Sequence, residues 1–84
     1  MFAKHNDINL FKTILGKSIK QNRLKLSMTL EMLGEITNLD SKNINKIELG
    51  KILPNSHTLS ILLIALEMEA SDFLKEYKKT SNRF

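Results

Sequence analysis

The apolar residues of this chain recur at intervals of three and four positions and do not alternate with polar ones. That spacing is the period of an amphipathic helix and predicts an all-α fold. Glycine and proline, which interrupt helices, occur only three times and once. We expect five helices, running from near Asp7 or Asn9 to about Leu24, from the Thr29 cap to Thr37-Asn38, from Ser41 to Leu49, from a cap at Asn55 or Ser56 to about Glu67, and from about Ala70 to Lys78.

The residues between the apolar stretches suit helix ends. Thr29 and Asp40 are of the types that cap a helix N-terminus with a side-chain oxygen. Asn38 can adopt the left-handed conformation that ends a helix, and Gly50 follows the third helix where glycine is preferred. These caps predict a short second helix and a short third helix joined by a tight turn.

The length of 84 residues corresponds to one domain, residues 1–84. Its structured core is expected at about 7–78, after a frayed lead-in at 1–6 and before a flexible tail at 79–84. A chain this short buries only a modest fraction of its surface, which favours stabilisation by a partner subunit.

The composition excludes several function classes. The absence of cysteine rules out disulfides, thiol catalysis and cysteine-based zinc sites. His5 and His57 show no ligand spacing, so neither a metal nor another cofactor is expected.

The longest apolar run, residues 61–66, is far shorter than the roughly 20 residues of a membrane helix. No signal peptide opens the chain, and we expect a cytoplasmic protein without a membrane partner. No nucleophile is paired with a base and no glycine loop suits phosphate, so neither enzymatic activity nor a small-molecule ligand is indicated.

The charge is unevenly distributed along the chain. The net charge is +4, and residues 10–26 carry five basic side chains and no acid. Residues 67–76 carry four acids against one lysine. This asymmetry suits a molecule that turns one side towards a polyanion.

The third helix has one apolar side and one unusual polar side. At about 100° per residue, Ile44 and Ile47 share the side that faces the core. Lysine and asparagine on the opposite side can donate to guanine and adenine edges. A merely solvated helix is the alternative, but such a helix has little reason to avoid glutamate on its outward face. The residues opposite the core are Lys42, Asn45, Lys46 and Leu49.

Residues 15–74 resemble the phage-repressor (Cro/cI, or Xre-type) helix-turn-helix family, whose members have five helices. Within this stretch, "NLDSKNINKIELGK" is most similar to controller proteins of restriction–modification systems. The small residue of Leu33-Gly34 corresponds to a position where two helices cross closely, and Asn38 holds the turn position usually occupied by glycine. The other matching positions are Leu15-Gly16, Ile19, Arg23, Ile44, Ile47, Glu48, Gly50 and Pro54.

The resemblance implies roles for particular residues. Arg23 and Glu48 stand where the family pairs an arginine of the first helix with a glutamate of the third, which implies a partly buried structural ion pair. The residues expected to read bases are Ser41, Lys42, Asn45 and Lys46, and those expected to contact the DNA backbone are Thr29, Asn43, Lys51 and Asn55.

Two positions depart from the family pattern. Leu30 stands where a DNA-anchoring glutamine is common, and Leu49 where arginine or asparagine is common. Leu49 either touches a thymine methyl or weakens DNA binding. Both departures favour an alternative function, a protein-interaction module of the same fold that serves as an antirepressor or antitoxin-like partner of another regulator.

The fourth helix carries a second apolar side. Ile61 and Ile64 lie nearly opposite its core-facing leucines, at positions where the family commonly has polar residues. Exposed apolar patches of this kind usually mark an interface. We predict a two-fold homodimer contact formed by Ile61, Ile64, Leu74 and Tyr77. The alternative is that the N-terminal extension with Phe2 folds over these residues.

The main expectation is a homodimeric transcription regulator, such as a controller protein or compact repressor, that binds double-stranded DNA at a pseudo-palindromic operator.

Overall fold

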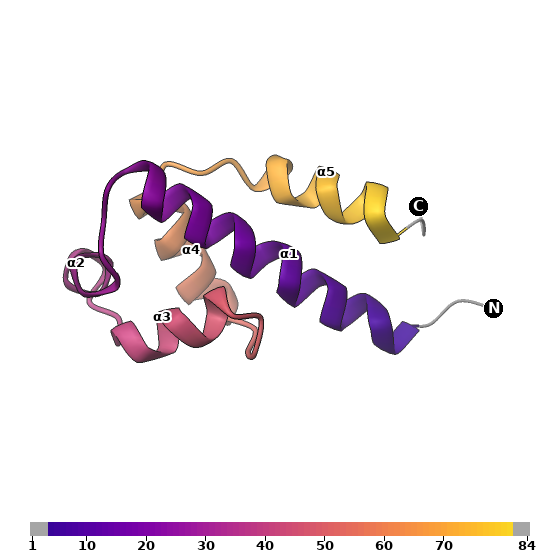
Figure 1. Ribbon diagram of the computed structural model, residues 1–84, viewed down its shortest axis with the longest axis horizontal. Helices are drawn as coiled ribbons and strands as arrows, with labels where there is room; N and C mark the ends of the chain where they lie inside the picture. Colours follow the sequence, from indigo (N-terminus) through magenta and orange to yellow (C-terminus); the bar gives the residue numbers. More distant parts are fainter. Residues whose placement is uncertain (1–3, 82–84) are drawn as a thin grey trace.

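Five α-helices and no strand occupy the part of the chain that the structure describes (Figure 1). This computed structural model describes the backbone of residues 4–81 and the side chains of residues 7–81. The helices are α1 (Lys4–Lys25), α2 (Leu30–Thr37), α3 (Ser41–Glu48), α4 (Ser56–Ala65) and α5 (Ala70–Ser81). The all-α, five-helix prediction is therefore confirmed.

The outer helices are longer than predicted, and their end turns explain why. α1 already begins at Lys4, where no glycine or proline interrupts it and Asp7 complements the helix dipole in the first turn. α5 continues to Ser81 because Lys78 and Lys79 suit its last turn. Residues 79–81, expected in a flexible tail, are thus helical, whereas 1–3 and 82–84 lie outside the described residues.

Four helix ends share one backbone motif. A residue one or two positions beyond each end has a positive φ, of 58°, 59°, 74° and 54° at Ser27, Asn38, Gly50 and Glu67. The next N–H then donates to the carbonyl five residues earlier, as in the 2.9 Å bond from Lys51 to Lys46. Only Asn38 and Gly50 were predicted to end helices in this way. The motif satisfies carbonyls that the end of a helix leaves unpaired, so these turns have a defined geometry.

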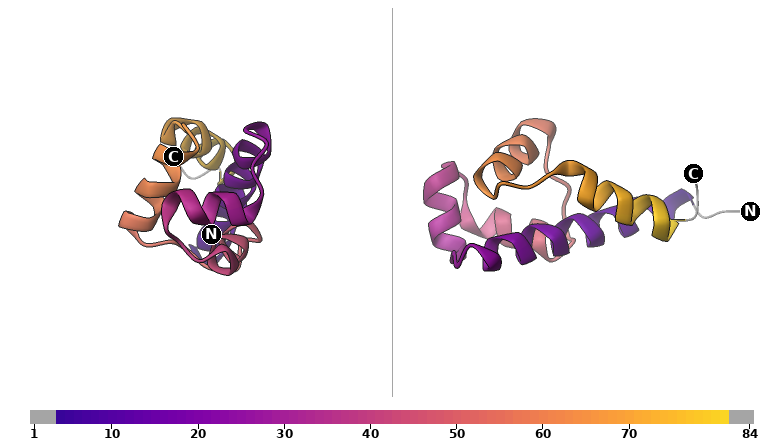
Figure 2. Two further views of the ribbon diagram at one scale, coloured as in Figure 1. Left: turned by 90° about the vertical axis from the view of Figure 1, so that its left-hand side faces the viewer. Right: turned by 90° about the horizontal axis from the view of Figure 1, so that it is seen from above.

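The helices are arranged around α1. α2, α3 and α4 gather around its C-terminal half, whereas α5 lies beside its N-terminal half (Figures 1 and 2). Phe11 of α1 meets α5 edge-on, with ring centroids 6.1 Å from Phe73 and 5.3 Å from Tyr77. The molecule is consequently elongated, with extents of 44, 20 and 20 Å.

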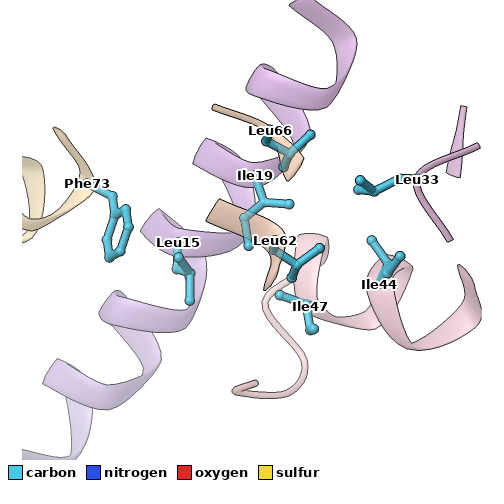
Figure 3. Close-up of a cluster of buried hydrophobic side chains, with 8 residues drawn as sticks. All are labelled: Leu15, Ile19, Leu33, Ile44, Ile47, Leu62, Leu66 and Phe73. Atoms are coloured by element: carbon cyan, nitrogen blue, oxygen red, sulfur yellow. The ribbon is translucent and has the colours of Figure 1, made fainter. Parts of the chain in front are cut away.

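Every helix contributes to one apolar core. Its fully or almost fully buried members are Leu15, Ile19, Leu33, Ile44, Ile47, Leu62, Leu66 and Phe73 (Figure 3). Ile44 and Ile47 come from α3 and point towards the side chains of the other helices (Figure 3). Burial of these two isoleucines orients α3, because rotation of the helix would expose them to water.

Gly16 allows α1 to lie directly against the backbone of α3. A Cβ atom at this position would overlap the carbonyl oxygen of Ile47 and lie 2.6 Å from that of Glu48. A Cβ atom at Gly34 would lie 2.9 Å from the carbonyl oxygen of Leu39 and in ordinary contact, at 3.5 Å, with the backbone nitrogen of Ser41. The close approach of α1 to α3 therefore depends strongly on Gly16. The approach of α2 to the backbone of the following turn depends less on Gly34.

We predict that Gly16→Ala lowers the free energy of unfolding by about 1–3 kcal/mol, because backbone has to move to admit the methyl group. Gly34→Ala is the matched control. Alanine gains roughly 1 kcal/mol over glycine inside a helix at both positions, so the comparison isolates the steric effect. Gly34→Ala, whose Cβ would meet one backbone oxygen at 2.9 Å, should lose less stability than Gly16→Ala. Urea unfolding followed by circular dichroism measures both variants. Equal stability of the two would show that Gly16 is not needed for the contact.

Candidate nucleic-acid interface

The side of α3 that faces away from the core is polar and open to solvent. Lys42, Asn45 and Lys46 are exposed, and their side chains hold no described partner. Ser41 lies at the edge of this side and is half-buried. The structure thus brings the four predicted base-reading residues together on one short helix, with Ser41 the least accessible.

The turn of residues 38–40 joins α2 to α3 and determines where α3 starts. Asn38 turns the chain with φ 59° and ψ 33°, and Leu39 packs against the core. Asp40 then caps α3 by accepting a hydrogen bond from the Lys42 N–H at 3.0 Å. The two helices and their turn form a helix-turn-helix unit, with the α3 surface directed outwards.

A buried ion pair holds the C-terminal end of α3 on α1. Arg23 donates from Nε to Glu48 Oε2 at 2.6 Å and from Nη2 to Oε1 at 2.9 Å. Its Nη1 also donates to the carbonyl oxygen of Met28 at 2.9 Å. The Arg23 and Glu48 side chains are only 8% and 2% exposed. The predicted pair is therefore present, and it also ties down the turn between α1 and α2.

The charge of Arg23 is stabilised by its partner. The hydrogen bond to Glu48, and to a lesser extent the charge of that carboxylate, raise the pKa of Arg23 above its ordinary value, against the opposing effect of burial. Arg23 accordingly stays charged at neutral pH and well above it. Two-point binding of a planar guanidinium also fixes the direction of the carboxylate.

The four predicted backbone-contacting residues are all exposed, and two of them also cap helices. Thr29 Oγ1 accepts the Met32 N–H at 3.0 Å, and Asn55 Oδ1 accepts the Thr58 N–H at 2.8 Å. Capping uses only their oxygen lone pairs, so the Thr29 hydroxyl and the Asn55 amide can still donate to phosphate. Asn43 lies on α3, and Lys51 lies just beyond it.

The two leucines that depart from the family pattern have different environments. Leu30 is half-buried and packs against the core, which gives it a structural role. Leu49 is 56% exposed at the end of the polar side of α3. Ile52 and Leu53 in the following loop are also exposed, a feature that periodicity could not reveal because loops have no periodic pattern.

The predicted dimer residues differ in accessibility. Ile64 is 78% exposed and Leu74 is 47% exposed, whereas Ile61 and Tyr77 are half-buried. Tyr77 packs on Phe11 within the chain. Phe2, the alternative cover for this surface, lies outside the described residues. Ile64 is accordingly the most accessible apolar group of the four.

Two further features are absent from the described part of the chain. No three histidine, cysteine, aspartate or glutamate side chains lie close enough together there to hold a metal ion. None of the described helices has the length and apolar character that crossing a membrane requires.

Comparisons with known proteins agree on the fold. Residues 19–73 match the HTH_3 family of helix-turn-helix domains. The clp gene regulator ClgR from Corynebacterium glutamicum has a similar crystal structure, with a TM-score of 0.74 and 22% identity over 86% of this chain and 77% of that one. A mutant of the restriction–modification controller protein C.Esp1396I matches with a TM-score of 0.70 and 24% identity over 99% and 98% of the two chains. Curated protein sequences give no match.

The family match covers more than half of the 84 residues and includes the whole helix-turn-helix unit. The fold, the outward polar side of α3 and the ion pair behind it agree with that match. The chain therefore belongs to the Xre-type helix-turn-helix family of DNA-binding domains, a family of transcription regulators rather than enzymes.

Proposed function

We propose that the chain is a sequence-specific transcriptional regulator that acts as a homodimer on a pseudo-palindromic operator, in the manner of a controller protein or compact repressor. The main support is the polar side of α3, which carries Lys42, Asn45 and Lys46 in the open. Its backbone is held from behind by the buried isoleucines and by the Arg23–Glu48 pair. A rigid helix with extended donors on one side suits the major groove.

Each side chain has a chemical match in the groove. Lysine donates to O6 and N7 of guanine, and asparagine pairs with N6 and N7 of adenine. Ser41 can contact any base edge that comes within reach of its short side chain. We expect Lys42, Asn45 and Lys46 to provide most of the discrimination, with Ser41 secondary because of its burial.

The residues proposed to contact the DNA backbone come from segments before and after α3 as well as from α3 itself. Thr29 caps α2 and Asn55 caps α4, so each lies where the N–H groups of a helix N-terminus also attract anions. Asn43 and Lys51 add one contact within α3 and one just beyond it. These contacts position the domain on the duplex without reading its sequence.

A homodimer supplies the affinity that one short helix lacks. Two copies of α3 about 34 Å apart would read successive major grooves, one for each half of a palindrome. Ile64 on α4 and Leu74 on α5 each provide exposed apolar area for a two-fold contact. Ile61 and Tyr77 would contribute their accessible parts.

Selection of bound sequences from a random duplex pool at two salt concentrations tests this function. We expect a two-fold motif with half-sites about one helical turn apart. Salt-sensitive binding without a motif would show instead that the basic surface merely attracts phosphate.

The variant Lys46→Ala is expected to relax the motif at one position of each half-site, with about 1–3 kcal/mol of discrimination lost there. Lys51→Ala is the matched control, since it removes the same charge from a residue assigned to phosphate. It should weaken binding to all sequences alike and reduce the salt dependence by about one ion per half-site, or about two for the dimer. If both variants leave the motif unchanged, Lys46 does not read a base.

A second candidate function is supported by the exposed apolar residues at the end of α3. Leu49, Ile52 and Leu53 form the kind of surface that binds proteins rather than phosphate. A protein-interaction module would bind its partner when Lys42 and Lys46 are both replaced by alanine. A DNA-binding regulator would lose its operator in the same variant.

A further inference from the structure

Leu49 is the apolar member of an otherwise polar reading surface. It follows Lys42 by seven positions and Asn45 by four, so it lies on the same side of α3. More than half of its surface is exposed, at 56%. Ile44 and Ile47, the other apolar residues of this segment, are buried on the opposite side.

The backbone beneath Leu49 is held in place. Its N–H donates to the Asn45 carbonyl at 2.9 Å, and it retains the helical conformation at φ −80° and ψ −1°. The next residue, Gly50, donates to the Ile47 carbonyl at 3.0 Å, and a Cβ there would be 3.4 Å from Cα of Thr13 in α1. An exposed leucine on a fixed backbone keeps its methyl groups within the small region that its rotamers reach.

The major groove offers a specific partner for such a group. Among the base edges that face it, only thymine presents an apolar group, the C5-methyl. A leucine beside donors that read guanine and adenine therefore has one apolar partner available in the groove. Contact between the two removes both methyl surfaces from water.

We infer that Leu49 is a specificity-determining residue, which contacts a thymine methyl at one position in each half-site and so selects T·A there. This inference rests on the proposed function, because it places α3 in the major groove. It adds apolar readout to the hydrogen bonds of Lys42, Asn45 and Lys46. Leu49 is then not a defect in the DNA-binding surface but part of its sequence code.

Uracil substitution tests the inference, because uracil differs from thymine only by the missing methyl. Each thymine of the selected operator is replaced in turn, in both half-sites, and binding is measured at constant salt. We expect one position at which the wild-type protein loses about four-fold in affinity per half-site, or roughly 15-fold for both, as burial of one methyl-sized group implies. Leu49→Ala should bind the thymine and uracil operators equally well.

Two further variants make the experiment specific. Leu49→Asn keeps the size of the side chain but removes its apolar surface, and it should also lose the preference for thymine. Ile52→Ala truncates an exposed apolar residue outside α3 and should keep the preference. The exposure of Leu49 means that these variants fold, which circular dichroism checks.

Each contrary outcome has a distinct meaning. Equal binding of the thymine and uracil operators by the wild-type protein at every position overturns the role of Leu49 while leaving the regulator intact. A thymine preference that persists in Leu49→Ala assigns methyl readout to another residue and also overturns it. Failure to select any motif overturns the proposed function, and this inference with it.

Discussion

Replacement of Arg23 by methionine is expected to lower the free energy of unfolding by about 3–5 kcal/mol, because it leaves the Glu48 carboxylate buried without its partner. Glu48 is 2% exposed at its side chain and receives two hydrogen bonds from Arg23. The Met28 carbonyl also loses a donor. The free energy of unfolding of a small domain is only about 5–15 kcal/mol in total, so the variant should be partly unfolded or close to it at physiological temperature.

Thermal unfolding provides the measurement. A loss of 3 kcal/mol in a domain of this size corresponds to a fall of at least about 12 °C in Tm. Lys20→Met is the matched control, since it removes one exposed positive charge from the same helix and should have little effect. A similar Tm for the two variants would mean that the pair contributes no more than a surface charge.

The double variant Arg23→Met, Glu48→Leu distinguishes the cost of leaving one carboxylate buried and unpaired from the net contribution of the ion pair to stability. With both charges removed, no uncompensated carboxylate remains, and most of the stability should return.

The pH dependence of the contribution that Arg23 makes to stability has a defined sign. A raised pKa means that the contribution of Arg23 is fully present below the ordinary pKa of arginine and disappears only above it. Titration of Arg23 should therefore not change the difference in the free energy of unfolding between wild type and Arg23→Met near neutral pH.

Replacement of Ile64 by lysine is expected to convert the proposed dimer into monomers and to weaken operator binding by roughly 10²–10⁴-fold. A charged residue at the centre of a small apolar contact opposes association, and the loss of one linked half-site removes the gain from two-point binding. Ile64 is a better position than Ile61 for testing the interface, because Ile64 is 78% exposed and its replacement leaves the core unchanged.

Sedimentation velocity and titration of the selected operator measure the two effects together. Leu24→Lys is the control, since it places the same charge at an exposed apolar residue of α1, outside the proposed interface. It should remain dimeric and bind the operator at least as well as the wild type. If Ile64→Lys sediments as a dimer, this surface is not the interface, whatever its affinity for DNA.

Local sequence determines much of this fold. Thr29, Asp40 and Asn55 cap helices because their side-chain oxygens reach the first free N–H groups, a contact that depends only on neighbouring residues. Asn38 and Gly50 end helices because they tolerate positive φ. The periodicity of Ile44 and Ile47 assigns the inward side of α3, and with it the outward reading surface.

Other features depend on packing between distant segments. Ser27 and Glu67 adopt positive φ although their side chains disfavour it, so residue type did not indicate these two turns. The structure, not the periodicity, shows that Gly16 lies against the Ile47 carbonyl and that Ile64 is more open than Ile61. Local sequence therefore determined where most helices begin, where α2 and α3 end, and which side of α3 faces outwards. Tertiary structure alone decided that Leu30 is covered while Leu49 stays exposed, because apolar character does not specify which neighbours surround a side chain.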